Sequence, residues 1–341
     1  MTSMRRPIAV LLAAACALAV AACGEKKEST AAPAKREQVR LMLDFFPNAD
    51  HAGIYAAQGT GAFDKAGLDV KIQTPSDPSA PLKLLAAGRV DLAISYEPEL
   101  LLARDRGQKL VAVGALVQKP LTSVVSIGHR AISDPKQLAG KTVGTAGIPY
   151  QSAYLKTILG RAGVDPSQVK EVNVGFNLVP AMLSGRVDAT LGAYWNYEAI
   201  QLQQARKRPK VIRMENVGVP TYDELVIVAR QSDLNAETGG AKVRRFMRAL
   251  TQGMNALRKD PNSGIDPLLR ANRDLDRRLQ EASVRATMPV FFPADRAKPF
   301  GSMDPAEWAA YGTWMARNRL LRNPPDAGSA LTNEFLPGQG P

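Results

Sequence analysis

Ala87-Gly88-Arg89-Val90-Asp91 ends a predicted helix and begins a predicted strand, and Ser184-Gly185-Arg186-Val187-Asp188 does the same in the second half of the chain. Each copy leads through a short apolar strand into a segment of aromatic and acidic residues. That segment is Ser95-Tyr96-Glu97 in the first half and Gly192-Ala193-Tyr194-Trp195-Asn196-Tyr197-Glu198 in the second. A motif that recurs in the same helix–glycine–strand context indicates two similar halves.

Strand and helix patterns alternate on both sides of this motif. Strands are predicted at residues 39–43, 68–72, 91–95, 109–116 and 142–145, and helices at residues 51–58, 81–87, 98–106 and 151–159. Such alternation is typical of βαβ units, so we predict an α/β fold with two lobes, each a mainly parallel sheet flanked by helices. The first lobe is expected to take residues 38–126 and 229–336 and the second residues 127–228, with residues 337–341 as a tail.

A ligand cleft is predicted between the two lobes. Open α/β sheets bind ligands beyond the carboxyl ends of their strands. Two facing lobes would therefore place four loops around one cleft, at residues 44–50, 95–97, 146–150 and 193–198. The chain is expected to cross between the lobes near residues 125–128 and 226–230, and a ligand that prefers the closed state would close the cleft.

The composition excludes several kinds of site. The chain of 341 residues is 22% charged and 45% hydrophobic, which is typical of a globular protein. Its two cysteines are Cys16 and Cys23, so the rest of the chain has no thiol for a disulfide framework, a zinc ribbon, an iron–sulfur cluster or a cysteine nucleophile. Its two histidines, His51 and His129, are too few for a histidine-rich metal site. We predict no catalytic residue, no metal site and no cofactor.

The N-terminus has the pattern of a targeting segment. Arg5 and Arg6 precede an apolar run over residues 7–22 that is too short to span a membrane and ends in small residues, as a secretory signal peptide does. Residues 18–24, LAVAACG, resemble a bacterial lipobox, which would make Cys23 the lipidated first residue of the mature protein. Residues 23–37 read as a polar tether. We therefore expect an exported protein held at a membrane by lipid on Cys23, the alternative being an ordinary signal peptide with an incidental cysteine.

The formal net charge of +12 invites a nucleic-acid hypothesis, which the pattern does not favour. The basic residues are scattered, except for one dense group on a predicted helix: Lys242, Arg244, Arg245, Arg248, Arg258 and Lys259. No aromatic residues interleave with that group and no nucleic-acid-binding motif appears. We interpret it as a solvated face, near anionic lipid or a membrane partner.

Residues 43–55, LDFFPNADHAGIY, resemble the opening of the pyrimidine-precursor-binding proteins of thiamine salvage. Further matches lie at residues 61–63, 67–70, 87–91, 192–198 and 331–336, so the resemblance runs from about residue 39 to residue 336. It implies the type 2 periplasmic-binding-protein fold, which sulfonate- and nitrate-type binding proteins and the fungal hydroxymethylpyrimidine synthases share. It also implies a monomeric substrate-binding lipoprotein of an ABC importer, with a permease and an ATPase as partners.

Two departures from the synthases argue against an enzyme. The synthases carry a cysteine-rich, iron-associated segment that would fall near residues 218–224, where this chain has no cysteine. They also use a histidine and a cofactor-linked lysine after the strand that contains Asp69, and residues 74–83 contain Lys83 but no histidine. We therefore do not expect synthase activity.

The resemblance implies a flat heteroaromatic ligand with an exocyclic amine, most simply an aminopyrimidine. Aromatic faces would come from Phe45, Tyr150, Tyr194 and Trp195. Glu198 and Asp44 would accept hydrogen bonds from the amine edge of the ring. Polar groups at the rim would be Asn48, Ser95 and Asn177, and His51, Tyr96 and Gly147 complete the expected ligand-binding set.

Other functions remain open at this point. Riboflavin, nitrate and sulfonates are alternative ligands of the same fold. A sulfonate site would need hydroxyl and arginine donors around an oxyanion, whereas carboxylates in the cleft repel an anion and favour an amine-bearing ring. A sensory or adhesive surface lipoprotein on this fold is a further alternative.

Overall fold

The computed structural model describes residues 36–129, 131–323 and 327–339. The predicted signal peptide, the lipidation at Cys23 and nearly all of the tether lie outside the described residues, so these predictions stay untested. Within the described ranges no helix is long and apolar enough to cross a membrane.

The first sheet has the strand order β2-β1-β3-β10-β4. Its strands are β1 (Glu37–Met42), β2 (Leu68–Gln73), β3 (Leu92–Ser95), β4 (Leu110–Val117) and β10 (Leu225–Arg230). β1 pairs in parallel with β2 and β3, and β10 runs antiparallel between β3 and β4. β10 is fully buried except for its last residue, as a central strand covered on both faces should be.

The second sheet repeats this arrangement in the order β7-β6-β8-β5-β9. Its strands are β5 (Thr122–Ser126), β6 (Thr142–Thr145), β7 (Lys170–Asn173), β8 (Ala189–Tyr194) and β9 (Lys210–Arg213). β6 pairs in parallel with β7 and β8, and β5 runs antiparallel between β8 and β9. The predicted two-sheet α/β fold is confirmed, but both sheets are mixed rather than mainly parallel, because each one includes a strand that enters from the other half of the fold.

Because of this exchange of strands, the chain passes between the two sheets at positions that differ from the predicted ones. Residues 122–126 belong to the second sheet, although the predicted division assigns them to the first lobe, and Leu225–Arg230 belong wholly to the first sheet. The chain therefore crosses at residues 118–121 and 218–224, before the predicted positions. Each crossing contains a proline, Pro120 or Pro220, which cannot donate a ladder hydrogen bond and so ends strand pairing. The division into two lobes as such stays a prediction.

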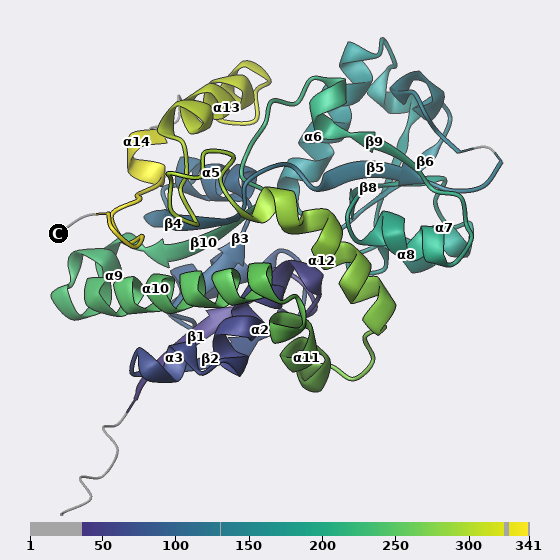
Figure 1. Ribbon diagram of the computed structural model, residues 1–341. Coiled ribbons are helices and arrows are strands. Elements are labelled where there is room, and N and C mark those ends of the chain that lie inside the picture. Colours follow the sequence, from purple (N-terminus) through teal and green to yellow (C-terminus); the bar gives the residue numbers. More distant parts are fainter. Residues whose placement is uncertain (1–35, 130, 324–326, 340–341) are drawn as a thin grey trace, which may run out of the picture. The chain divides into compact units, whose positions relative to one another are not determined.

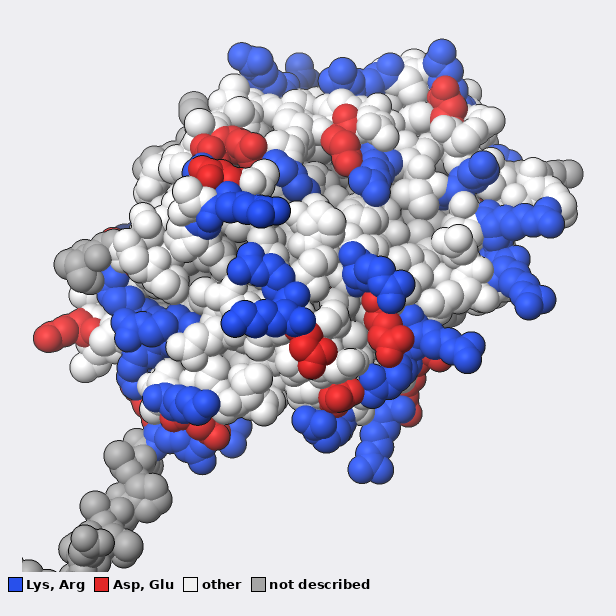
Figure 2. Space-filling view, in the orientation of Figure 1, with Lys and Arg blue, Asp and Glu red and all other residues white. Residues whose placement is uncertain are grey.

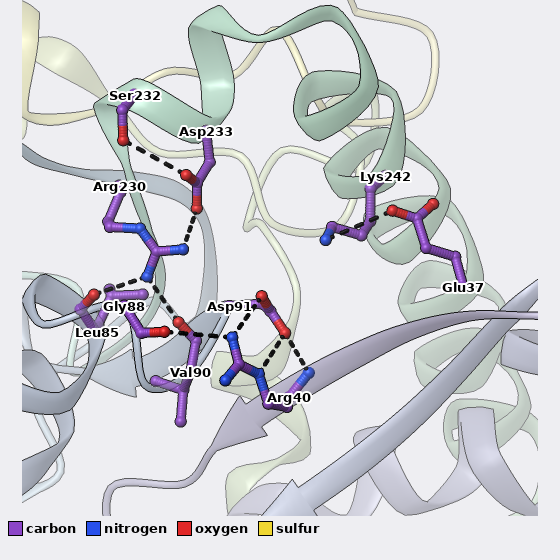
Figure 3. A network of polar contacts seen from close by, with 10 residues as sticks. All are labelled: Glu37, Arg40, Leu85, Gly88, Val90, Asp91, Arg230, Ser232, Asp233 and Lys242. Carbon is purple, nitrogen blue, oxygen red and sulfur yellow. Dashed lines mark hydrogen bonds and ion pairs between the residues drawn. The ribbon is translucent and has the colours of Figure 1, made fainter.

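The sequence motif that recurs in both halves has one structural role. In the first copy, Asp91 accepts a hydrogen bond from the backbone N–H of Arg40 at 2.8 Å and donates its own N–H to the Arg40 carbonyl (Figure 3). In the second copy, Asp188 makes the same exchange with Thr142. Gly88 and Gly185, at φ +70° and +71°, end the preceding helices in the left-handed conformation that glycine tolerates. In each sheet, the aspartate thus connects the start of the third parallel strand (β3 or β8) to the first parallel strand (β1 or β6).

Figure 3 also shows how β10 is anchored beside this motif. The Arg230 guanidinium donates to the Leu85 and Val90 carbonyls, both at 2.7 Å, and pairs with Asp233. Lys242, on α10 (Glu237–Lys259), pairs with Glu37 at 3.5 Å. The end of β10 is therefore fixed to the turn that precedes β3.

Helices connect and cover the strands. The α-helices are α2 (Ala52–Gly59), α3 (Ala62–Lys65), α4 (Ala80–Ala86), α5 (Glu97–Asp105), α6 (Pro149–Arg161), α7 (Leu178–Leu183), α8 (Glu198–Gln204), α9 (Gln231–Asn235), α10 (Glu237–Lys259), α11 (Asn262–Ala271), α12 (Arg277–Phe291), α13 (Pro305–Arg317) and α14 (Ala327–Ala330). The 3-10 helices are η1 (Ala49–His51), η2 (Pro135–Leu138), η3 (Pro166–Gln168) and η4 (Met214–Val217).

The long helix α10 packs against α2 (Figure 1). Gly253 makes this approach possible, because a Cβ atom there would lie 2.5 Å from the Gly53 carbonyl oxygen and from the Ala57 backbone. Gly264 of α11 similarly approaches the Ala52 carbonyl, at 2.4 Å from the position of a Cβ. Small residues thus hold α2, and the η1 turn before it, in a fixed place next to the candidate site.

Basic side chains are spread over the face seen in Figure 2, with acidic ones among them. Several of the dense group on α10 have partners within the chain. Arg245 pairs with Glu37, Arg244 stacks on Phe335, and Arg258 lies over Phe292 with 4.5 Å between its guanidinium carbon and the ring centre.

Candidate functional site

A pocket forms where the loops after β1 and β3 meet segments of the second sheet. It has about 400 Å³ of space between its lining side chains, open mouth included. The lining residues are Asp44, Phe45, Asn48, Tyr96, Ala146, Ile148, Tyr150, Gln151, Leu178, Gly192, Tyr194, Tyr197 and Glu198. Ten of them come from the four predicted cleft loops, and Gln151, Leu178 and Gly192 lie outside those loops.

Asp44 follows β1 directly and is almost fully buried at one wall of the pocket. Its Oδ1 lies 2.8 Å from Nε2 of His51, and its Oδ2 accepts a hydrogen bond from the Tyr96 hydroxyl at 2.8 Å. The backbone N–H of Asn48 donates to Nδ1 of His51, so the neutral histidine carries its proton on Nε2 and donates it to Asp44. The carboxylate is thereby oriented by two donors, and each oxygen retains acceptor capacity toward the pocket.

Asn48 orders the turn that supplies these groups. Its side-chain oxygen accepts the backbone N–H of Asp50 at 2.8 Å and caps η1. Because His51 ends η1 and is fully buried, its position follows from this cap. His51 is therefore a support behind Asp44 and does not line the pocket.

Glu198 is the second acid of the pocket and begins α8. Its Oε2 accepts the backbone N–H of Tyr194 at 2.7 Å. Burial raises the pKa of the Glu198 carboxyl to about 7, against hydrogen bonds from backbone N–H groups that lower it. A group with such a pKa is ready to accept or share a proton near neutrality.

A third acid lies behind the pocket wall. The Asn196 side-chain amide donates to Oδ1 of Asp50 and to the Thr287 hydroxyl, both at 2.6 Å. Burial raises the pKa of Asp50 to about 6. This cluster joins η1, the segment after β8 and helix α12. Thr287 gives no sequence signal of this role, because it lies far along the chain on an ordinary amphipathic helix.

Aromatic side chains supply much of the remaining wall. Phe45, Tyr96, Tyr150, Tyr194 and Tyr197 all line the pocket. Tyr96 and Tyr150 lie next to each other, with ring centroids 5.7 Å apart. Faces and edges of such rings suit a flat heteroaromatic ligand.

Gln151 and Gly192 line the pocket but were not predicted as site residues. Gly192 has φ +115°, and a Cβ there would lie 2.4 Å from the Gln151 amide nitrogen. Gln151 accepts the Ala146 backbone N–H through its side-chain oxygen at 2.8 Å. Gly192 thus leaves room for the side-chain amide of Gln151, which holds the pocket loop at Ala146. This is a tertiary contact, and the sequence pattern alone does not reveal it.

Seven of the predicted ligand-binding residues line the pocket: Asp44, Phe45, Asn48, Tyr96, Tyr150, Tyr194 and Glu198. The other five do not. His51 supports Asp44 from behind, and the Ser95 hydroxyl donates to Glu99 at 3.1 Å. Gly147 packs against the Asn173 side chain, and Asn177 is exposed at the start of α7. The Trp195 side chain points away from the pocket.

Trp195 differs most from its expected place. Its indole N–H donates to the Pro120 carbonyl at 2.9 Å, and the Arg213 guanidinium lies 4.1 Å from its ring centre. Tyr194 is the last residue of β8 and Trp195 is the first residue of the turn that follows, so strand alternation does not fix the direction of Trp195. Tyr194 faces the pocket, and Trp195 faces the crossing segment at Pro120.

The pocket lining contains two carboxyl groups and no lysine or arginine, in a chain that has 44 of these basic residues. Such a lining favours a neutral or cationic ligand over an anionic one. Nor do the described residues include a group of three or more His, Cys, Asp or Glu side chains that could hold a metal ion.

Comparison with known proteins identifies the family of this chain. The family model described as NMT1/THI5 like matches residues 48–263, a range that includes Glu198 and begins four residues after Asp44. The chain belongs to the NMT1/THI5-like family. This confirms the resemblance drawn from the sequence.

Members of the NMT1/THI5-like family with different activities are similar to this chain. A formylaminopyrimidine-binding protein of Halalkalibacterium halodurans is 34% identical over 304 residues, 87% of this chain and 91% of the relative. A 4-amino-5-hydroxymethyl-2-methylpyrimidine phosphate synthase of Legionella pneumophila is 22% identical over 305 residues, 89% of this chain and 93% of the relative. The family thus holds both binding proteins and synthases.

Solved structures show the fold of this NMT1/THI5-like chain. The alkanesulfonate-binding protein SsuA of Xanthomonas axonopodis superposes with a TM-score of 0.68 at 16% identity, covering 88% of this chain and 99% of that one. A Candida albicans protein described as having the generic periplasmic binding protein fold superposes with a TM-score of 0.63 at 17% identity, covering 87% and 96%. The fold is that of the type 2 periplasmic binding proteins, as predicted.

Proposed function

We propose that this protein is the substrate-binding component of an ABC importer and captures an unphosphorylated aminopyrimidine that is a precursor of thiamine. The observation that carries the proposal is the pair of buried carboxyl groups, Asp44 and Glu198, in an aromatic pocket without a basic residue. A protonated ring nitrogen beside an amine donates two parallel hydrogen bonds, and a carboxylate accepts both. The similarity to a formylaminopyrimidine-binding protein supports the same ligand class.

The competing function is that of the synthases in this family. Their product is named as a phosphate ester, and a phosphate needs cations or backbone N–H groups around it. The pocket lining offers neither lysine nor arginine. The chain also has no cysteine after Cys23 and no histidine in residues 74–83, where the synthases place reacting groups. These features favour binding without catalysis.

The test is a comparison of 4-amino-5-hydroxymethyl-2-methylpyrimidine with its phosphate ester. Isothermal titration calorimetry on the full-length protein in detergent should give binding of the alcohol and at least about 100-fold weaker binding of the ester, because a phosphate would face two carboxyl groups. Mass spectrometry of ligand released from freshly purified protein by denaturation identifies the natural aminopyrimidine. Equal or tighter binding of the ester would exclude the proposal.

Export and anchoring are part of the proposal and rest on the sequence alone. Lipid on Cys23, followed by the tether over residues 23–37, would keep the protein at a membrane surface within reach of a permease. The anchored mature protein is expected to partition into detergent and to carry acyl chains on Cys23. Cys23→Ala should leave the precursor unprocessed. A soluble, unlipidated mature form that retains Ala22 would contradict the anchor.

A further inference from the structure

We propose that the mouth of the pocket is a second subsite, which accepts a flat, cationic ring joined to the pyrimidine by a short linker. The inference rests on the proposed function and extends its substrate class from single-ring aminopyrimidines to two-ring ones. We call this mouth the vestibule. Its lining residues are Phe45, Phe46, Pro47, Asn48, Phe176, Leu178, Val179, Pro180, Leu183, Tyr197, Glu198, Gln201, Asn272 and Leu275.

The vestibule is continuous with the pocket. The two share Phe45, Asn48, Leu178, Tyr197 and Glu198 as lining residues. The vestibule has about 930 Å³ of space, part of it open to solvent, against about 400 Å³ for the pocket. A single pyrimidine ring bound at Asp44 and Glu198 would occupy the pocket and leave the vestibule unfilled. A ligand that reaches past Glu198 enters the vestibule directly.

The vestibule is the place where large apolar side chains face solvent. Phe46 and Leu183 are each 47% exposed, and both line it. Among the described residues only one other large hydrophobic side chain is exposed, Val211 at 36%, and it lies outside the vestibule. Exposed apolar groups that gather beside a binding pocket are typical of a ligand contact rather than of ordinary surface.

Three phenylalanine rings form one aromatic wall of the vestibule. Phe45 and Phe46 lie between β1 and η1, and Phe176 lies between β7 and α7. The Phe176 ring centroid is 4.6 Å from that of Phe45 and 4.5 Å from that of Phe46. Two loops from different sheets thus form one aromatic cluster in which Phe46 is exposed at the vestibule, and an exposed aromatic ring attracts a cation to its face.

The charge of the vestibule points to the same occupant. Its one charged lining residue is Glu198, which stands at the boundary with the pocket, and no lysine or arginine lines it. A cationic ring beside Glu198 would be attracted by both the carboxylate and the aromatic wall, whereas an anionic substituent would meet no donor of positive charge. The vestibule therefore fits a flat cationic ring.

The test uses three ligands on the full-length protein in calorimetry. The first ligand, thiamine, has a cationic thiazolium ring joined to its aminopyrimidine by one methylene group. The second is the thiamine analogue in which a neutral thiophene ring replaces the thiazolium ring. The third, 4-amino-5-hydroxymethyl-2-methylpyrimidine, has no second ring. Thiamine is expected to bind at least as tightly as the single-ring compound and about 10-fold more tightly than the thiophene analogue, because the cation–π contribution is lost in the latter.

Variants separate the vestibule from the pocket. Phe46→Ala combined with Phe176→Ala should weaken thiamine about 10-fold and leave the single-ring compound within about 2-fold. Gln201→Lys adds a cation to the exposed edge without removing a ring, and should also weaken thiamine selectively. Val211→Ala is the matched control, an exposed apolar residue outside the vestibule, and should change neither ligand.

The outcomes distinguish this inference from the proposed function. Binding of the single-ring compound without binding of thiamine would overturn the second subsite and keep the proposed function. Equal losses for both ligands in the vestibule variants would also overturn it. Failure of wild-type protein to bind either compound would overturn both. Preserved thermal melting of the variants establishes that they are folded.

Discussion

Glu198→Gln is expected to weaken aminopyrimidine binding by about 10- to 150-fold, and at the same time to make the ligand-free protein more stable at neutral pH. The loss of affinity follows because glutamine removes the negative charge and offers an amide donor where an acceptor is needed. Its side-chain oxygen can still accept the Tyr194 N–H that Glu198 accepts at 2.7 Å. Calorimetry measures the affinity, and denaturant unfolding measures the stability.

The gain in stability follows from linkage. Burial raises the folded-state pKa of Glu198 from its usual value near 4.5 to about 7. Between these two values the unfolded chain has already released a proton that the folded protein still binds, so the free energy of unfolding falls as the pH rises through this window. Glutamine does not titrate and removes this fall. The stability difference between variant and wild type should grow from near zero at pH 4.5 to about 2–3 kcal/mol at pH 7.5.

Glu99→Gln is the matched control. Glu99 is also buried, and burial raises its pKa to about 7, but it accepts a hydrogen bond from Ser95 and does not line the pocket. Its replacement should give a similar gain in stability above pH 7 and leave the affinity within about 2-fold. An unchanged affinity in Glu198→Gln would remove Glu198 from the binding site, and an equal loss in Glu99→Gln would make the effect a general one of buried charge.

Glu224→Ala is expected to destabilise the protein by about 3–5 kcal/mol. Glu224 lies at the second crossing and is fully buried. Its carboxyl oxygens accept the backbone N–H groups of Leu121 and Thr122, at 2.7 and 2.8 Å, and the hydroxyls of Thr122 and Tyr222, at 2.8 and 3.0 Å. Alanine would leave these four donors buried without an acceptor, where each costs free energy.

Glu224→Gln separates the role of the hydrogen bonds from that of the charge. The amide oxygen can still accept from both backbone N–H groups and from Tyr222, while the amide N–H₂ donates to the Thr122 hydroxyl, which can accept as well as donate. The cost should stay below about 1 kcal/mol in chemical denaturation. A loss as large as that of alanine would mean that the charge itself holds the two crossing segments together.

The repeated motif and the strand alternation made the fold predictable, because both are local. Helix–glycine–strand junctions depend on a few adjacent residues, and the two aspartates, Asp91 and Asp188, make the same backbone contact in both sheets. The acids and aromatic residues of the pocket could also be predicted from the sequence, because they follow the carboxyl ends of strands. Asp44 and Glu198 line the pocket as the loop positions imply.

The remaining features depend on tertiary contacts. Nothing near Asn196 in the sequence indicates that it will join Asp50 to Thr287 of α12. Nor does the apolar run that includes β5 indicate which sheet it enters, because a strand with apolar residues on both faces fits either one. The direction of Trp195 was not predictable for a similar reason: it lies one residue past the end of β8, in a turn where the alternation of a strand no longer sets the direction of a side chain.

The exchange of strands between the two sheets has a consequence for how this chain folds. β10 pairs with β3 and with β4, joining Val226 to Ser95 and to Ala115, so that every strand of the second sheet lies between the paired residues in the sequence. Until β10 has emerged during synthesis, the facing edges of β3 and β4 have no partner and are open to incorrect pairing. Pairings at such long sequence separation slow folding. The first sheet, although its strands are made first, is therefore expected to be completed last.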